Sequence, residues 1–179
     1  RMTYEQLAAV AAQVGFEHYG PLDPATIELK QEVREMCASG KCAMYDKRWS
    51  CPPGCGTLEE CRALLSGYTH GILVQSVGEL EDSFDIEAMM ETEATHKERF
   101  FALRKALLDA GAEAMAAGAG CCTICTECTY PDAPCRFPEQ KISSMEALGM
   151  LVVEVCKAND LGYNYGPNTI AYTSCFLLK

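Results

Sequence analysis

The sequence lacks most of the features by which common protein classes are recognised. Its 179 residues contain no run of 18 apolar residues that could span a bilayer, and its first residues include no apolar signal region. Only 15 Lys and Arg stand against 25 Asp and Glu, which gives a net charge of −10 at pH 7. Because nucleic-acid binders need clustered basic residues, this balance argues against such a partner. We therefore expect a cytoplasmic protein that binds neither a membrane nor a nucleic acid.

Familiar catalytic motifs are missing as well. The sequence has no phosphate-binding glycine loop, no dinucleotide-binding fingerprint and no Ser–His–Asp pattern. Its three histidines, His18, His70 and His96, have no metal-ligand spacing with one another or with the cysteines. The absence of these motifs leaves open whether the protein is an enzyme.

Cysteine is the residue that the chain has in excess, with 12 among 179 residues. Disulfide scaffolds belong to short secreted chains with little core, whereas 49% of this chain is hydrophobic. Buried structural thiols would be scattered singly, yet ten of the twelve fall into two groups of five. These are Cys37, Cys42, Cys51, Cys55 and Cys61, and Cys121, Cys122, Cys125, Cys128 and Cys135. Two such groups predict two metal centres, each with one spare thiol.

Capping signals and apolar runs predict the surrounding fold. Ser or Thr followed three residues later by Glu or Gln predicts helix starts at Thr3, Thr57 and Ser143. Further helices are expected over about 24–36 and 85–117, and strands over about 16–22, 70–77 and 168–178. We expect one metal-binding domain over residues 1–179, of the α/β class with α+β as the alternative. Helices would pack on a small sheet that carries two cysteine-rich loops, about 37–61 and 118–138.

The second group of cysteines carries the sharper signal. Cys122, Cys125 and Cys128 follow one another at two-residue gaps, and Cys135 comes seven positions later. One loop with such gaps can reach three corners of a [4Fe-4S] cluster, whereas zinc ribbons pair two Cys-x2-Cys knuckles from distant segments. This spacing favours an iron–sulfur cluster over zinc, with zinc as the alternative. Cys121 is either an alternative ligand or a free thiol beside the metal.

The first group matches no ferredoxin spacing. Cys51 precedes two prolines, which stiffen the chain after the thiol. Cys61 falls in the first turns of the helix expected after Thr57, where the helix dipole favours a thiolate. The ligands expected here are Cys37, Cys42, Cys51 and Cys61, which leaves Cys55 as the spare thiol.

Three segments give the chain a family resemblance: KCAMYDKRWSCPP, CTICTECTYPDAPCRFPEQKISSMEALGM and LGYNYGPNTIAY. They resemble, in this order, a prokaryotic family of predicted metal-binding proteins, domain of unknown function 2284. The family's cysteine pattern matches the eight residues Cys37, Cys42, Cys51, Cys61, Cys122, Cys125, Cys128 and Cys135, whereas Cys55 and Cys121 are additions in this chain. The resemblance implies metal binding in anaerobe-type prokaryotes and supplies no reaction.

Three functions fit these patterns. The first is an iron–sulfur protein with two [4Fe-4S] clusters that transfers single electrons, its acidic surface docking on a redox partner protein. The second is an iron–sulfur enzyme with an open iron or a spare thiol that acts on a small molecule, with Cys55, Cys121 and Arg136 as its working residues. The third is a structural zinc module that binds a partner, since zinc is redox-silent. The pattern leaves the substrate, the reduction potential and the oligomeric state open.

Overall fold

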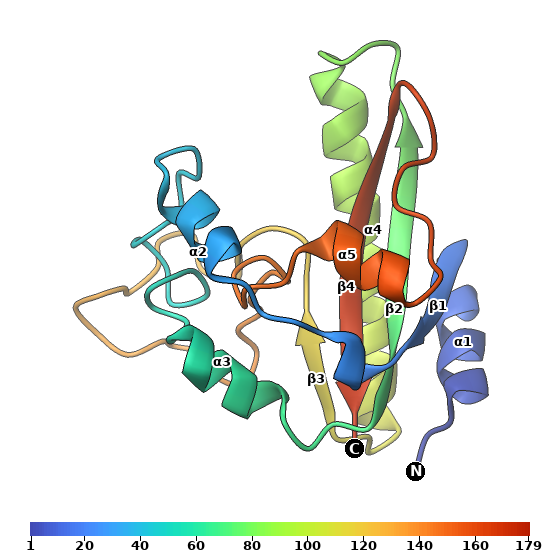
Figure 1. Cartoon of the computed structure of the whole chain (residues 1–179), viewed down its shortest axis with the longest axis horizontal. Helices are drawn as coiled ribbons and strands as arrows, with labels where there is room; N and C mark the ends of the chain where they lie inside the picture. Colours follow the sequence, from blue (N-terminus) through green and yellow to red (C-terminus); the bar gives the residue numbers. More distant parts are fainter.

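The computed structural model describes all residues, 1–179, and is built around one four-stranded antiparallel sheet of order β1-β2-β4-β3 (Figure 1). The strands are β1 (His18–Leu22), β2 (His70–Glu79), β3 (Ala114–Ala117) and β4 (Thr169–Leu178). The two long strands β2 and β4 pair along their full length, from His70 opposite Leu178 to Glu79 opposite Thr169. Short β1 and β3 flank this central pair.

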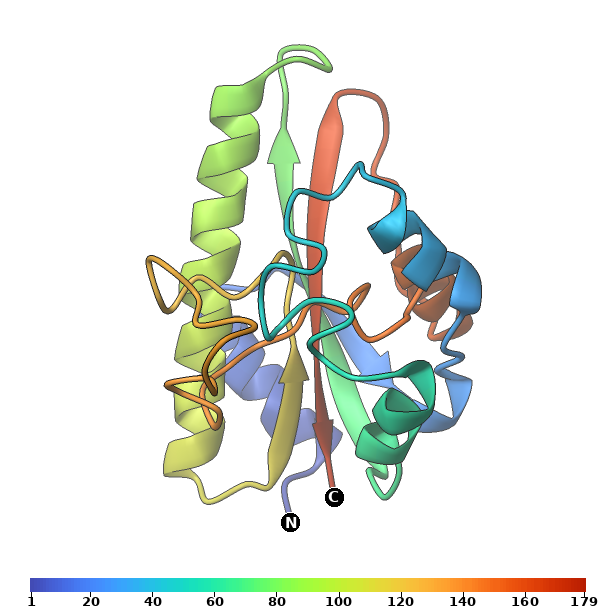
Figure 2. The same cartoon turned by 90° about the vertical axis from the view of Figure 1, so that its left-hand side faces the viewer.

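Helices cover both faces of the sheet (Figure 2). On one face lie α1 (Tyr4–Gln13) and α4 (Ile86–Asp109). On the other lie α2 (Gln31–Ala38), α3 (Leu58–Leu65) and α5 (Val152–Ala158), together with the first cysteine-rich loop. The second cysteine-rich loop lies beside α4, where Lys97 donates a hydrogen bond to the Thr123 hydroxyl at 3.1 Å. The fold is therefore mixed α/β, as the sequence predicts. None of its helices is both long and apolar enough to cross a membrane.

The core is divided by the sheet, because successive side chains of a strand point to opposite faces. On β2, Ile72 and Val74 pack with Phe100 and Leu103 of α4, whereas Leu73 packs on the other side. That second cluster contains Met145, Leu148, Met150, Val152, Val155, Cys156 and Cys175. Burial of apolar area on both faces is the main stabilising contribution, at roughly 25 cal/mol per Å².

Two of the three predicted capping boxes are confirmed. The Thr3 side chain accepts a hydrogen bond from the backbone N–H of Gln6, and the Gln6 side chain accepts one from Thr3; Thr57 and Glu60 make the same reciprocal pair. The prediction at Ser143 is wrong: the Ser143 carbonyl instead accepts a hydrogen bond from Gly118. The helix begins only at Val152, after Leu151, which makes no side-chain cap.

Two other helix predictions have the wrong bounds. Asp23 caps only a short 3₁₀ turn, Pro24–Thr26, and α2 begins at Gln31 because Leu29 pairs with Met150 as an isolated β-bridge. The helix expected over 85–117 ends at Asp109, and Gly111 then takes a left-handed conformation (φ 73°). Residues 114–117 pair with β4 instead of continuing that helix.

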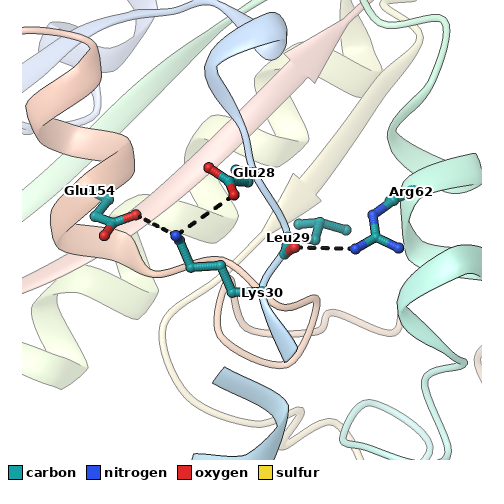
Figure 3. Close-up of polar contacts among 5 residues, drawn as sticks. All are labelled: Glu28, Leu29, Lys30, Arg62 and Glu154. Atoms are coloured by element: carbon teal, nitrogen blue, oxygen red, sulfur yellow. Dashed lines mark hydrogen bonds and ion pairs between the residues drawn. The ribbon is translucent and has the colours of Figure 1, made fainter. Parts of the chain in front are cut away.

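A small polar network anchors the segment before α2 (Figure 3). The Lys30 ammonium lies 3.1 Å from a carboxylate oxygen of Glu154 in α5 and 3.8 Å from one of Glu28. The Arg62 guanidinium of α3 donates to the Leu29 carbonyl at 3.3 Å. These contacts join α3 and α5 to the extended segment 28–30. They therefore fix the start of α2, the helix that carries Cys37.

Candidate metal centres

The two cysteine-rich loops pack against each other beyond the end of β3 (Figure 2). The Trp49 indole N–H of the first loop donates to the Ala133 carbonyl of the second at 2.9 Å, and the Arg48 guanidinium donates to the Cys122 carbonyl at 3.2 Å. In return, the Tyr130 hydroxyl donates to the Asp46 carboxylate at 2.6 Å. The loops therefore form one polar assembly, although they are distant in sequence.

A glycine permits the closest approach between these loops. A Cβ atom on Gly54 would lie 2.8 Å from the Arg48 carbonyl oxygen and 2.8 Å from the Tyr130 ring. Tyr130 in turn packs edge-to-face on Trp49, with 4.8 Å between ring centroids. The glycine is therefore required by packing, because any side chain here would push the aromatic pair away.

The second group of thiols surrounds one small pocket. All four expected ligands, Cys122, Cys125, Cys128 and Cys135, line it. Trp49 and Arg136 line the same pocket, and Arg136 donates to the Glu127 carbonyl at 2.8 Å. The pocket thus combines four thiols from one loop with an aromatic wall from the other.

The surroundings of this pocket favour the charged form of a thiol. Desolvation by burial raises the pKa of the Cys128 thiol, but the backbone N–H groups of Trp49 and Tyr130, which donate hydrogen bonds to it, lower it. The positive charges of Arg48 and Arg136 act in the same direction, so the pKa of Cys128 lies below its ordinary value. Since a thiolate is the form that binds metal, these groups prepare Cys128 as a ligand.

The first group of cysteines is divided between two places. Cys37, Cys42 and Cys51 line a larger cavity, where they are joined by Cys121 of the second group. Burial is the largest cause that raises the pKa values of the Cys37 and Cys51 thiols, and the neighbouring Cys42 thiol adds to it in both. The structure therefore places three of the four expected ligands with a thiol that the spacing left unassigned.

The fourth expected ligand, Cys61, lies beside Cys55 and the guanidinium of Arg34. Arg34 Nη2 is 3.2 Å from Cys61 Sγ and 3.6 Å from Cys55 Sγ. The hydrogen bond from the Cys55 thiol is the largest cause that lowers the pKa of Cys61, and the same bond raises that of Cys55. Neither sulfur lines the large cavity. The ligand role of Cys61 stays a prediction, and the structure adds Arg34 as its neighbour.

A single buried serine connects the two thiol groups. The Ser50 hydroxyl is 3.7 Å from Cys51 Sγ and accepts a hydrogen bond from the Cys122 backbone N–H at 3.1 Å. Cys121 and Cys122 are consecutive residues, yet the first lines the large cavity and the second the small pocket. The two sites are therefore neighbours, joined through one peptide bond and one hydroxyl.

Sequence reasoning missed three residues of this region. Arg34 lies one helical turn before Cys37, and this i, i+3 spacing indicates proximity to that thiol but not the contacts with Cys55 and Cys61. Ser50 carried no signal beyond its position before Cys51. The capping pattern at Ser143 assigns Glu146 to the start of a helix, whereas Glu146 lines the large cavity, where burial raises the pKa of its carboxyl.

The two isolated cysteines belong to the hydrophobic core. Cys156 and Cys175 are fully buried, and burial raises their pKa values to about 11 and about 12. Thiols that stay protonated in an apolar environment are poor metal ligands. Substitutions of Cys156 and Cys175 can therefore serve as controls when the ten cysteines of the two groups are replaced.

The donor set fits a metal held by thiolates. The pocket around Cys128 is lined by four thiols, and backbone N–H donors and cationic side chains stabilise the charged form of Cys128. Since a thiolate is the form of cysteine that binds metal, this lining is chemically suited to a metal held by thiolates.

Comparison with known proteins gives one match. No curated protein and no solved structure is detectably similar to the chain. The family model described as "Predicted metal-binding protein (DUF2284)" matches residues 20–178, which include both cysteine-rich loops and all four strands except the start of β1. The chain therefore belongs to this family of predicted metal-binding proteins.

Proposed function

We propose that the protein binds two [4Fe-4S] clusters and transfers single electrons between a redox partner protein and an acceptor. The observation that carries this proposal is the neighbourhood of two thiol groups on either side of the Cys121–Cys122 peptide bond. A thiolate-held iron cluster changes its charge by one electron with little rearrangement of its ligands. Two such groups a few residues apart supply the short separation that electron transfer requires.

The residues of the chain would tune each site differently. Around Cys128, backbone N–H donors with Arg48 and Arg136 stabilise negative charge on sulfur. Around Cys51 and Cys37, burial and neighbouring thiols oppose it. Hydrogen bonds to sulfur and burial are among the factors that set the reduction potential of a cluster. The site at Cys128 would therefore accept an electron more readily than the site at Cys51.

Charge also fits a protein partner. The chain carries −10 overall, and a strongly acidic surface favours docking on a basic face of another protein. Arg136, beside the second thiol group, is an exposed positive charge in this otherwise acidic chain. The expected signature is an association that weakens as ionic strength rises.

The test is metal and sulfide analysis of anaerobically purified protein. Two cubane clusters predict about eight iron atoms and eight sulfides per chain, with an electron paramagnetic resonance signal after reduction by dithionite. Cys125→Ala and Cys42→Ala should each remove about half of the iron, whereas Cys156→Ala, a buried core thiol, should remove none. A colourless protein with stoichiometric zinc would overturn the proposal in favour of a structural zinc module.

An iron–sulfur enzyme is the second candidate, and the large cavity favours it. This cavity is lined by Cys121 and by the expected ligands Cys37, Cys42 and Cys51. It also extends past these thiols to other residues such as Tyr163. A spare thiol or an open iron in such a wall would be accessible to a small molecule. If the Cys121→Ser variant keeps its full iron content but converts a small-molecule substrate at an altered rate, this candidate is supported. If the variant loses iron, Cys121 is a ligand.

A further inference from the structure

The cavity beside the first thiol group is too large for a cluster alone. Its volume is about 1020 Å³, and it is lined by residues of α2, of the segment after β3, of the turn around Glu146 and of β4. Cavities of about 300–1,000 Å³ are typical of sites for small organic ligands. Eight inorganic atoms would occupy only the part next to the thiols, so most of the space is left for another molecule.

The lining is mostly apolar. Hydrophobic residues make up 14 of the 23 that line the cavity. Met36, Met44 and Val152 contribute aliphatic or thioether groups, and Tyr45 and Tyr163 contribute aromatic rings. An apolar wall with a few polar groups is the usual composition of a small-molecule site, and methionine adapts to ligands of different shape. The preferred occupant is therefore largely apolar.

The charged groups of the cavity limit the ligand further. Glu32, Glu35 and Glu146 line it, against the single cation Lys41. Because three carboxylates against one ammonium leave this lining with a net negative charge, phosphates and carboxylates would bind less favourably than uncharged groups. The hydroxyl groups of Tyr45 and Tyr163 are donors to which an uncharged acceptor could bind.

We infer that this cavity is a binding site for an uncharged, largely apolar organic molecule bearing a hydrogen-bond acceptor such as a ketone oxygen, which lies against the methionines and tyrosines next to the thiols. The inference goes beyond electron transfer, and it holds whichever metal the thiols bind. If the second thiol group holds a cluster, the ligand would lie on the side of Cys121 away from it. The site would then hold a small molecule next to the cysteine thiols that line the same cavity.

Two aromatic ketones provide the test. Benzophenone is uncharged and, on irradiation, inserts into nearby C–H bonds, so that mass spectrometry can locate it. 4-Benzoylbenzoate has the same rings and ketone with one added carboxylate. The anaerobically purified, metal-loaded protein should bind benzophenone at least tenfold more tightly than 4-benzoylbenzoate, and the crosslink should fall on Met36 or Met44. Crosslinks confined to residues outside the cavity, or tighter binding of the carboxylate, would overturn the inference.

Cavity-filling variants separate this site from other apolar surfaces. Ala171 of β4 lines the cavity, and Ala171→Trp should weaken benzophenone binding at least tenfold. Ala43 is exposed and does not line it, so Ala43→Trp should leave the affinity unchanged. Should Ala171→Trp fail to fold, Met36→Glu on the half-exposed face of α2 places a charge in the same wall and should weaken binding as strongly. Unchanged binding in the folded variant would overturn the inference.

Two further measurements keep this inference distinct from the proposed function. The double variant Glu32→Gln, Glu35→Gln should bind 4-benzoylbenzoate at least threefold more tightly and benzophenone equally well, because it removes two negative charges from the lining. An unchanged preference between the ketones would contradict the role assigned to charge. Iron and sulfide content, measured on the same samples, tests the clusters independently of ketone binding.

Discussion

The Nη2 atom of Arg34 lies 3.2 Å from the Sγ atom of Cys61, whose side chain is almost fully buried. The same guanidinium donates through Nη1 to the Gly56 carbonyl at 2.8 Å and through Nε to the Ala147 carbonyl at 3.1 Å. One side chain of α2 thus joins the start of α3 to the turn that carries Glu146. A guanidinium presents its donors in a rigid planar fork, which a lysine ammonium cannot reproduce.

Arg34→Lys should therefore destabilise the protein strongly. Loss of two or three partly buried hydrogen bonds from a charged donor should lower the free energy of unfolding by about 2–4 kcal/mol. Urea unfolding under anaerobic, reducing conditions measures this loss. Arg62→Lys is the matched control, because Arg62 makes one hydrogen bond, to the Leu29 carbonyl at 3.3 Å, and should lose less than about 1.5 kcal/mol. Equal losses in the two variants would contradict the role given to Arg34.

Ser50→Ala tests the connection between the two thiol groups. The hydroxyl is the acceptor for the Cys122 N–H, and Ser50 is 1% exposed, so alanine leaves that donor without its partner. We expect a loss of about 1–3 kcal/mol in the free energy of unfolding. Ser66→Ala removes a hydroxyl that donates to the Ala63 carbonyl at the exposed end of α3, and should change stability by less than about 0.5 kcal/mol. If Ser50→Ala is as mild as Ser66→Ala, the serine does not hold the loops together.

Local signals predicted much of this structure. The capping boxes at Thr3 and Thr57 involve residues three apart, so their hydrogen bonds are decided within one turn of helix. The four thiols from Cys122 to Cys135 belong to one loop, and their spacing was enough to group them. The apolar run of β2 likewise predicted a strand, because the middle of β2 is buried on both faces of the sheet. The strand predicted over 168–178 is confirmed as β4, although its last six residues are all buried and do not alternate.

Non-local contacts decided the rest. Ser143 and Glu146 satisfy the capping pattern, yet no helix starts there. The backbone N–H of Gly118, 25 positions before Ser143, donates a hydrogen bond to the Ser143 carbonyl instead. Cys121 joins Cys51 because the two loops pack through Trp49 and Arg48, a contact that no spacing within either loop encodes. The position of Arg34 between two thiols depends on α2 meeting α3, which only the assembled core provides.

Removal of the metal should loosen the loops and spare the sheet. No helix or strand lies between α2 and α3 or between β3 and α5, so metal bonds would supply much of the order of these loops. After treatment with a chelator under anaerobic conditions, trypsin should cut fastest after Lys41, Lys47 and Arg136, all of which are exposed in the loops. Lys105, exposed on α4, should stay protected because it lies within a helix. Digestion that is identical with and without metal would show that the loops are ordered without it.

The substitution Gly54→Ala tests how the first cysteine-rich loop packs on the second. Gly54→Ala places a methyl group 2.8 Å from the Tyr130 ring and from the Arg48 carbonyl, closer than carbon and oxygen atoms normally approach. We expect a loss of about 1–3 kcal/mol, as is usual for overpacking. Gly40→Ala is less suitable as a control because Gly40 has a positive φ, whereas Gly20→Ala has no contact closer than 3.6 Å. Urea unfolding of Gly54→Ala and Gly20→Ala gives the comparison, and a larger loss in Gly20→Ala would refute the argument.

His96 should make stability fall in mild acid. Its ring is 2% exposed and lies between the hydroxyl groups of Ser76 and Ser174, at 2.9 and 2.7 Å. Burial, with a smaller contribution from Arg99, lowers its pKa from 6.5 to about 4. Between these values the unfolded chain binds a proton that the folded protein does not, so stability is complete above pH 6.5 and declines toward pH 4, by about 3 kcal/mol over the whole range.

The measurement is urea unfolding at pH 7 and pH 5, in the wild type and in His96→Gln. Carboxylates contribute equally to both proteins, so the difference between the two pH effects isolates the histidine. The wild type should lose about 2 kcal/mol more than His96→Gln between these pH values, because 1.5 pKa units at about 1.4 kcal/mol each fall within that interval. His18→Gln should retain the wild-type loss, since His18 lies outside the pair of serines. A histidine that acted as a metal ligand would instead make His96→Gln lose metal at both pH values, and its two serine partners leave neither ring nitrogen free for that role.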